Sequence, residues 1–277
     1  MVRFPHAKIN LGLNVVRRRN DGYHDIRSVL LPIPLYDILE AVVDTDLPDG
    51  TVSLVRTGRD VPGRPDEDLI VRAAGSIHED LHLPGIRAHL HKMIPVGGGL
   101  GGGSSDGTGM LLLLDAMLGL ELSKEALRGY AARLGSDTSF FLEHRPCLAL
   151  SRGEVLEPVD LDLSGHWFLL IDPGIHVSTA EAFGNVHPSG TEVDLIGILR
   201  RPIQEWRDRL TNDLEVPVFA AYPELASMRD ALYLAGASYA AMSGSGSSMF
   251  GLFRREPQPL KDLPASRQWV LPAAPVI

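Results

Sequence analysis

The chain contains a single cysteine, Cys147, among its 277 residues, which excludes an internal disulfide. So little cysteine is typical of a reducing, cytoplasmic compartment, and we interpret Cys147 as a buried small hydrophobic residue. Long apolar runs are also missing. The longest candidate, 110–120, is cut by Asp115 and is shorter than the roughly 18–20 residues of a membrane-spanning helix. The first residues lack the apolar core of a secretory signal, so we expect neither a membrane protein nor a secreted one.

Positive charge is in deficit. Lys and Arg total 26 against 35 Asp and Glu, and the net charge is −9. A surface of this sign repels phosphate backbones, which argues against a general nucleic-acid binder. The contents of 44% hydrophobic and 22% charged residues are those of a folded globular protein, and the length favours two domains.

The first half of the chain alternates between strand and helix periodicity. Apolar residues at every second position from Ala7 to Val15 predict a strand with one buried face, which places Lys8 and Asn10 together on the open face. A turn is expected at Asn20-Asp21-Gly22. Apolar spacings of three and four predict helices over 68–81, after the glycine cluster at 110–118, and over 123–134; further strands are predicted around 37–43, 51–56 and 86–90.

The second half resembles a separate unit. A strand is predicted over 167–171, helices from Ser178 and from Pro223 to Gly236, and two strands on either side of 243–246. Strands and helices mixed in this way indicate an α+β fold. We place the boundary near Glu157-Pro158, which predicts domains of residues 1–157 and 158–277.

Six glycines crowd into the seven residues 97–103, with Leu100 between them. The cluster lies between a predicted strand and a predicted helix, where a flexible linker is not expected. Glycines let backbone N–H groups converge on one point, and a helix N-terminus adds the positive end of its dipole. Ser104 and Ser105 can cap the helix start. The cluster therefore predicts a site for a nucleotide phosphate.

Three other glycine motifs fit this region less well. The dinucleotide pattern G-x-G-x-x-G is matched almost automatically by so many glycines, and Pro95 interrupts the strand that should lead into it. A Walker loop needs a lysine that does not follow here. The hydrolase elbow G-x-S-x-G matches 103–107, but a glycine loop stands where a strand should enter the serine.

The combination of motifs resembles the GHMP kinase superfamily. The resemblance runs from about Pro5 to Phe253 and is carried by three motifs, which are Pro5–Leu11, Pro95–Asp106 and Ala240–Gly246. It is narrowed to one branch of the superfamily by Asp21-Gly22-Tyr23-His24, by residues 69–74 and by Gly135-Ser136-Asp137.

The resemblance implies a two-domain α+β GHMP kinase fold. An N-terminal domain of the ribosomal-protein S5 domain 2 type would pack on a ferredoxin-like C-terminal domain, with the site between them. It further implies an enzyme that transfers the γ-phosphoryl group of ATP, with Mg²⁺, to the 2-hydroxyl of a cytidine-diphosphate-linked methylerythritol, a step of non-mevalonate isoprenoid biosynthesis. Its partners are then two small molecules, and the oligomeric state stays open. The alternatives are another small-molecule kinase of the superfamily, of homoserine or mevalonate type, and a nucleotide-binding module without turnover.

The resemblance also assigns roles to particular residues. Lys8 and Asp137 match the catalytic pair. The ATP phosphate loop matches Pro95, Val96, Gly97, Gly98, Gly99, Leu100, Gly101, Gly102, Gly103, Ser104 and Ser105. The positions that bind the phosphate acceptor in the family are matched by Asn10, Tyr23, His24, Thr179 and Phe183. The two aromatic rings would hold the cytosine between them, and the histidine would bond to it.

Each of these residues taken singly also has a plain structural interpretation. Lys8 fits a solvated lysine on an open strand face, and Asp137 fits the cap of a short helix before Phe140. Tyr23-His24 fits surface decoration after a turn, and 243–246 fits a simple hairpin turn. The appearance of all of them in family order favours the functional interpretation.

Three positions depart from the family pattern. Asp68 stands where an asparagine associated with the adenine pocket is usual, which leaves the adenine contacts open. Thr138-Ser139 replace a small apolar residue and a proline, which predicts a looser turn after Asp137. His6 stands where a smaller residue is common. The metal ligands and the role of the last two dozen residues are also open.

Overall fold

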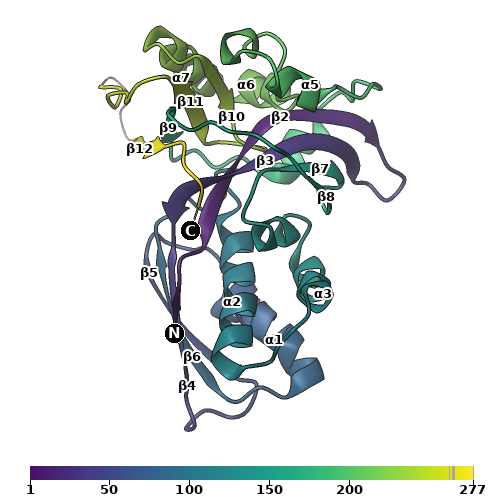
Figure 1. Ribbon diagram of the computed structural model, residues 1–277, viewed down its shortest axis with the longest axis vertical. Coiled ribbons are helices and arrows are strands. Elements are labelled where there is room, and N and C mark those ends of the chain that lie inside the picture. Colours follow the sequence, from purple (N-terminus) through teal and green to yellow (C-terminus); the bar gives the residue numbers. More distant parts are fainter. Residues whose placement is uncertain (262, 264–265, 277) are drawn as a thin grey trace. The chain divides into compact units, whose positions relative to one another are not determined.

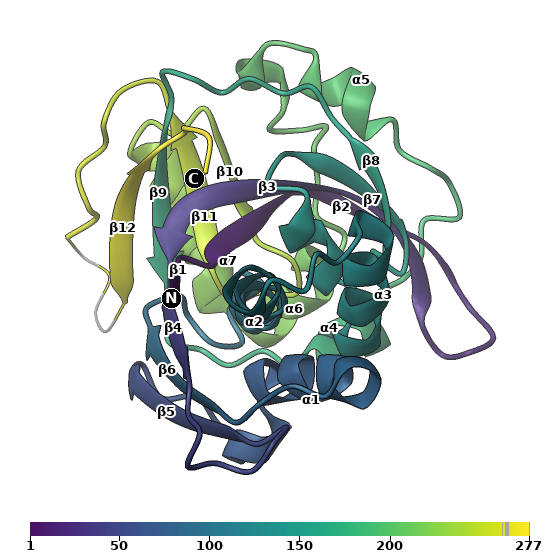
Figure 2. The same cartoon turned by 60° about the horizontal axis from the view of Figure 1, so that its bottom comes forward.

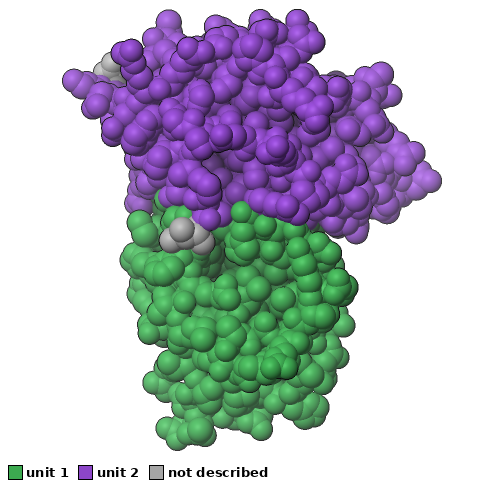
Figure 3. Space-filling model, viewed as in Figure 1, with its two compact units in different colours: residues 1–7, 35–96, 101–144 green, residues 8–34, 97–100, 145–277 purple. Residues whose placement is uncertain are grey.

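The computed structural model describes residues 1–261, 263 and 266–276. The chain divides into two compact units, coloured separately in Figure 3. Unit 1 comprises residues 1–7, 35–96 and 101–144, and unit 2 comprises residues 8–34, 97–100 and 145–277. No helix among the described residues is both long enough and apolar enough to cross a membrane.

Unit 1 is one sheet with helices on one face (Figure 1). The strand order is β1-β4-β6-β5, in which only the β5–β6 pair is parallel. The elements are β1 (Val2–Arg3), β4 (Ile38–Val43), β5 (Val52–Gly58), η1 (Pro65–Glu67), α1 (Leu69–Leu81), β6 (Ile86–Lys92), α2 (Gly102–Leu118), α3 (Lys124–Leu134) and η2 (Thr138–Leu142).

The helices of unit 1 begin where their sequences provide caps. Asp68 accepts a hydrogen bond from the N–H of Ile70 at the start of α1, and Ser123 accepts one from Ala126 at the start of α3. Leu39, Ala88 and Leu90 of the sheet, with the apolar faces of α1, α2 and α3, form one buried core. Figure 2 looks almost along the axis of α2, a helix buried on most of its surface.

Unit 2 contains two sheets. One has the order β2-β3-β7-β8 and the other β10-β11-β9-β12, the latter antiparallel throughout. The strands are β2 (His6–Arg18), β3 (His24–Tyr36), β7 (Cys147–Ser151), β8 (Val155–Pro158), β9 (Trp167–Asp172), β10 (Tyr239–Met242), β11 (Met249–Phe253) and β12 (Arg267–Pro272). The helices are α4 (Thr179–Gly184), α5 (Leu195–Leu199), η3 (Ile203–Glu205), α6 (Glu215–Ala221) and α7 (Pro223–Leu234).

The predicted α+β class and most predicted elements are confirmed. One prediction is wrong. The alternation of apolar residues predicted one exposed face for β2, but every residue from His6 to Val15 is buried and this part of the strand has no open face. The long strand β3 was not predicted, because Pro32 and Pro34 break the pattern expected of a strand interior. Cys147 is buried in β7, as expected.

The predicted boundary at Glu157-Pro158 falls within β8, and the compact units exchange segments instead of dividing the chain at one point. The exchange is possible because β2 and β3, from the first half of the chain, form a sheet with β7 and β8. The assignment of residues 1–157 and 158–277 as two family domains stays a prediction.

Candidate active site

The glycine loop takes a backbone path that needs glycine. Gly97, Gly99 and Gly101 have φ values of 69°, 76° and 70°, in the left-handed region that other residues rarely adopt. At Gly99 there is a second requirement, because a Cβ would overlap the carbonyl oxygen of Ser243. The glycine cluster is therefore a shaped loop and not a flexible connection.

The carbonyl groups of residues 98–100, the part of the loop that belongs to unit 2, are held by other residues of that unit. The carbonyl of Gly98 accepts from the N–H of Ser248 at 3.1 Å, that of Gly99 from Ser243 Oγ at 2.9 Å, and that of Leu100 from the N–H of Lys8 at 2.9 Å. The backbone N–H groups of residues 97–100 have no acceptor among the described residues. With the carbonyls anchored, these amides can serve an anion.

The helix that follows begins without a side-chain cap. Its N-cap is Gly101, and no side chain in the described chain caps it. Ser104 and Ser105 lie inside α2, so the prediction that they cap the helix start is wrong. The cause is that α2 starts two residues before the serines. The first-turn N–H groups and the helix dipole are consequently available to a negative ligand.

The head of Lys8 is buried beside the turn at residues 243–246. Its side chain is 4% exposed, and Nζ donates to Asn10 Oδ1 at 2.6 Å. Asn10 Nδ2 in turn donates to Ser28 Oγ at 2.8 Å. A Cβ on Gly244 would lie 3.4 Å from Lys8 Nζ, so the turn passes close over the ammonium. The interpretation of Lys8 as a solvated surface lysine is therefore wrong.

Two side chains of unit 2 fix that turn. Asn212 Nδ2 donates to the carbonyls of Met242 at 3.0 Å and Gly244 at 2.8 Å, and Ser243 Oγ bonds to the glycine loop. The segment is the connection of the β10–β11 hairpin, as the plain interpretation held, but it also supports the loop. Sequence reasoning missed Asn212, because an isolated asparagine carries no pattern.

Asp137 stands directly before η2. It is the N-cap residue of this short helix, but its side chain makes no capping hydrogen bond within the described chain, which contradicts the interpretation of Asp137 as a cap. Thr138 and Ser139 are buried, and Thr108 Oγ1 of α2 donates to the carbonyl of Thr138 at 2.8 Å. The looser turn expected from these two residues is therefore not observed.

His6 packs against the same short helix. Its ring lies 5.3 Å from that of Phe141 and 5.4 Å from that of His144, measured between ring centroids. Burial lowers the pKa of His6 to about 4, so the ring is neutral at ordinary pH. The larger side chain at this position fills space beneath the segment that carries Asp137.

We expect His6 to make the protein acid-sensitive. A histidine with a lowered pKa stabilises the fold fully above its unfolded pKa of about 6.5, and this contribution is lost as the pH falls toward 4, by at most about 3 kcal/mol. The difference in unfolding free energy between the wild type and His6→Phe should therefore shrink across this pH range in denaturant titrations. The exposed His187→Phe is the control, and an unchanged difference for His6→Phe would contradict the prediction.

The predicted substrate residues lie in unit 2. The rings of His24 and Phe183 meet at 5.4 Å between centroids with a 31° interplanar angle, although they come from distant parts of the chain. Thr179 Oγ1 lies 3.1 Å from Ser245 Oγ, in the turn that covers Lys8. Burial, with the charge of Arg18, lowers the pKa of His24 and favours its neutral ring. Neutral imidazole can both donate and accept a hydrogen bond.

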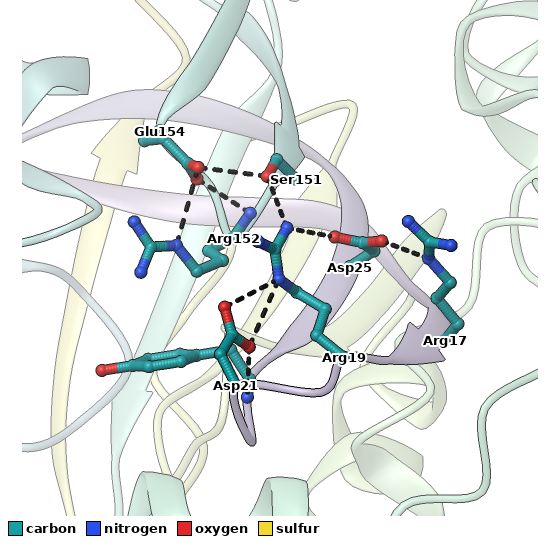
Figure 4. A network of polar contacts seen from close by, with 8 residues as sticks. Arg17, Arg19, Asp21, Asp25, Ser151, Arg152 and Glu154 are labelled. Carbon is teal, nitrogen blue, oxygen red and sulfur yellow. Dashed lines mark hydrogen bonds and ion pairs between the residues drawn. The ribbon is translucent and has the colours of Figure 1, made fainter.

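Tyr23 is 56% exposed in the turn between β2 and β3. Arg19, Asp21 and Asp25 of the same hairpin form a polar network with Ser151, Arg152 and Glu154 (Figure 4). The guanidinium of Arg152 lies 5.1 Å from its ring centroid. Arg19 Nη1 bonds to Asp25 Oδ1 at 2.9 Å and to Ser151 Oγ at 3.3 Å, which ties the hairpin tip to the β7–β8 turn. Arg152 therefore lies against one face of the Tyr23 ring, a contact that the sequence did not suggest.

Comparisons with known proteins give the class. Residues 68–143 match the family model described as the GHMP kinases N terminal domain, and residues 195–262 match the GHMP kinases C terminal model. The chain is thus a GHMP kinase by both models. A solved mevalonate kinase from Methanococcus jannaschii, 14% identical with a TM-score of 0.72 over 98% of each chain, shares the fold.

Closer relatives define the family within that class. The chain is 44% identical over 256 residues to the 4-diphosphocytidyl-2-C-methyl-D-erythritol kinase of Bacteroides fragilis, which covers 92% of this chain and 93% of the relative. A crystal structure of 4-(cytidine 5'-diphospho)-2C-methyl-D-erythritol kinase matches with 35% identity and a TM-score of 0.77, covering 91% and 90% of the two chains. The chain belongs to the 4-diphosphocytidyl-2-C-methyl-D-erythritol kinase family. The predicted family and two-domain GHMP kinase fold are confirmed.

Proposed function

We propose that this kinase transfers the γ-phosphoryl group of ATP to the 2-hydroxyl of 4-(cytidine 5'-diphospho)-2-C-methyl-D-erythritol, in cytoplasmic, non-mevalonate isoprenoid precursor biosynthesis. The observation that carries the proposal is the glycine loop, whose carbonyls are anchored to unit 2 and whose amides are left for an anion. The names of the relatives identify the substrate class. Homoserine and mevalonate kinases share the fold at only 14–19% identity. The ring pair of His24 and Phe183 suits a nucleobase.

In this proposal the loop of residues 95–105 binds the phosphates of ATP through its backbone amides. Phosphoryl transfer depends on positioning and charge neutralisation more than on covalent help from the protein. The ammonium of Lys8 offsets negative charge on the transferring group, and the carboxylate of Asp137 orients the hydroxyl and accepts its proton late in the reaction. Lys8 is suited to this role because its head is held by Asn10 in a water-poor position.

Mg²⁺ would neutralise the phosphate oxygens when bound with ATP. The described residues contain no group of three His, Cys, Asp or Glu side chains that could hold a cation. Mg²⁺ commonly binds through one or two protein ligands together with substrate phosphates, so the chain needs no dedicated metal cage. The part left to the protein is the binding of the phosphates by the amides of the loop.

The cytidine side of the proposal rests on Tyr23, His24 and Phe183, with Asn10 and Thr179 nearer the turn that covers Lys8. A cytosine stacks on aromatic rings at about 1–3 kcal/mol per contact. A neutral His24 can bond to the edge of the base. Because His24 and Phe183 contact each other here, a base placed between Tyr23 and Phe183 would have to separate them.

Coupled ADP release tests the proposed reaction. The purified protein is assayed with ATP, Mg²⁺ and one acceptor, with homoserine and mevalonate as the control acceptors. We expect turnover with the cytidyl substrate alone. Turnover with a control acceptor would favour the rival kinases, and nucleotide binding without ADP release for any acceptor would favour a non-catalytic module.

We expect Phe183→Ala to raise the KM for the cytidyl substrate by about tenfold to a hundredfold, the range of one lost stacking contact. The KM for ATP should change little, because this ring contacts His24 and, within the described part of the chain, no ring contact joins it to the glycine loop. Phe219→Ala is a matched control, since Phe219 also packs against the core of unit 2 but stacks on Arg229. Equal effects of both variants on both KM values would refute a base-stacking role.

A further inference from the structure

Three ionisable side chains are buried together in unit 1. Lys92, Asp37 and Asp106 are 2%, 0% and 3% exposed. Lys92 Nζ donates to Asp37 Oδ2 and to Asp106 Oδ2, each at 2.5 Å. Burying charges costs several kcal/mol per ion, and a buried pair often stabilises a fold no better than apolar residues do. A contribution to folding stability therefore does not by itself explain why these three charged residues are buried together.

The two carboxylates of the cluster lie at opposite ends of the glycine loop, and Lys92 joins them. Asp37 Oδ1 accepts from the backbone N–H groups of Met93 at 2.5 Å and Ile94 at 2.9 Å, which fixes the chain just before the loop begins at Pro95. Asp106 lies in the second turn of α2, just after the loop ends. Lys92 bridges the two carboxylates, so one ammonium joins the entry and the exit of the loop.

The start of α2 rests directly on this lysine. A Cβ on Gly102, the first residue of the helix, would lie 2.9 Å from Lys92 Nζ and 2.9 Å from Ile94 Cγ2. Only a residue without a side chain fits at that distance without displacing the lysine. The height of the helix N-terminus above β6 is thus set by contact with the cluster.

Burial disfavours a full negative charge on both carboxylates of the cluster. Asp106 Oδ1 is buried without a partner among the described residues. Burial, and after it the neighbouring charge of Asp37, raise the pKa of Asp106 well above its usual value, against the pull of Lys92. Burial alone would lower the pKa of Lys92, but the two carboxylates raise it, and it stays protonated. The raised pKa of Asp106 lessens the negative charge that opposes a phosphate at the adjacent helix start.

We propose that Lys92, Asp37 and Asp106 act as positioning residues that hold the two ends of the phosphate loop at a fixed separation and so preorganise it for ATP. None of the three needs to touch the nucleotide. The proposal rests on the ATP-binding role of the loop given above. A preorganised loop binds more tightly because less ordering is required on binding.

Asp106→Ala removes one tie and leaves Lys92 paired with Asp37. We expect the Kd of a non-hydrolysable ATP analogue, measured by calorimetry, to rise about tenfold, and amide exchange of residues 96–103 to accelerate. The KM for the cytidyl substrate should stay within about twofold. Asp106→Asn keeps an oxygen for Lys92 and should restore the affinity nearly to the wild-type value.

Ile77→Ala is the control for simple destabilisation, because Ile77 is fully buried in the same unit and belongs to its apolar core. It should lower Tm without changing the Kd of the analogue at a temperature where both variants are folded. The proposal is overturned if Asp106→Ala lowers only Tm, or if it weakens both substrates equally. Should Asp106→Ala fail to fold, the same calorimetry on Lys92→Met, which removes both ties and keeps most of the volume of the lysine stem, decides in the same way. Because calorimetry needs no turnover, an absence of ADP release with the cytidyl substrate would count against the proposed reaction and not against the cluster.

Discussion

Lys8→Met is expected to lower kcat by about a hundredfold to a thousandfold, the range for removal of one group that stabilises charge in a transition state. Methionine keeps most of the volume of the lysine stem, so the buried strand β2 should still pack. The substitution leaves Asn10 Oδ1 without its 2.6 Å donor, which costs about 1–3 kcal/mol of stability and is measured separately by Tm. Single-turnover kinetics then isolate the chemical step.

Asp137→Asn tests the other half of the pair at nearly unchanged shape, and we expect a comparable fall in kcat. If the two groups act as one unit, the double variant should be scarcely slower than either single variant. Lys124→Met provides a matched control, since the same change is made at a lysine that is half-exposed and pairs with Glu143. A near-normal kcat in either Lys8→Met or Asp137→Asn would remove that residue from the proposed chemistry.

The fold was predictable where local pattern and burial agree. Helix α1 was predicted from its apolar spacing, and the structure adds that Asp68 caps its start. The position of strand β2 was predicted correctly, but the burial of both its faces was not. Alternation along one strand does not reveal what covers the second face. The division of the chain into two units of several segments each could not be predicted for a similar reason. The pairing of β3 with β7 joins segments more than a hundred residues apart.

The candidate site was predictable as a set of motifs but not as a set of contacts. The glycine cluster predicts an anion site from composition and position in the sequence, and this stays a prediction. The anchoring of Gly98, Gly99 and Leu100 depends on tertiary hydrogen bonds that the sequence does not reveal. The buried cluster did leave a trace in the sequence. Lys92 continues the series of inward positions in β6 at Ile86, Ala88 and Leu90, and a charged residue at such a position requires a partner.

Gly99→Ala should be the most damaging single change in the loop. The added methyl group would overlap the carbonyl oxygen of Ser243, which belongs to backbone and cannot rotate away, and φ is 76°. The left-handed conformation alone costs an L-residue about 1–2 kcal/mol. We expect the loop to leave its position on the 243–248 turn, with a loss of about a hundredfold or more in kcat/KM for ATP, since a misplaced loop 1 Å away can cost this much.

The stability of Gly99→Ala should fall far less than its activity, because the hydrogen bonds at risk are those of the Gly98, Gly99 and Leu100 carbonyls and not those of either core. Gly129→Ala is the matched control: Gly129 lies within α3, and a Cβ there meets nothing within 4 Å. Alanine should even stabilise that helix slightly. Unchanged affinity of Gly99→Ala for an ATP analogue, at unchanged Tm, would show that the loop conformation does not form the phosphate site, and the amides of residues 97–100 would then need another ligand.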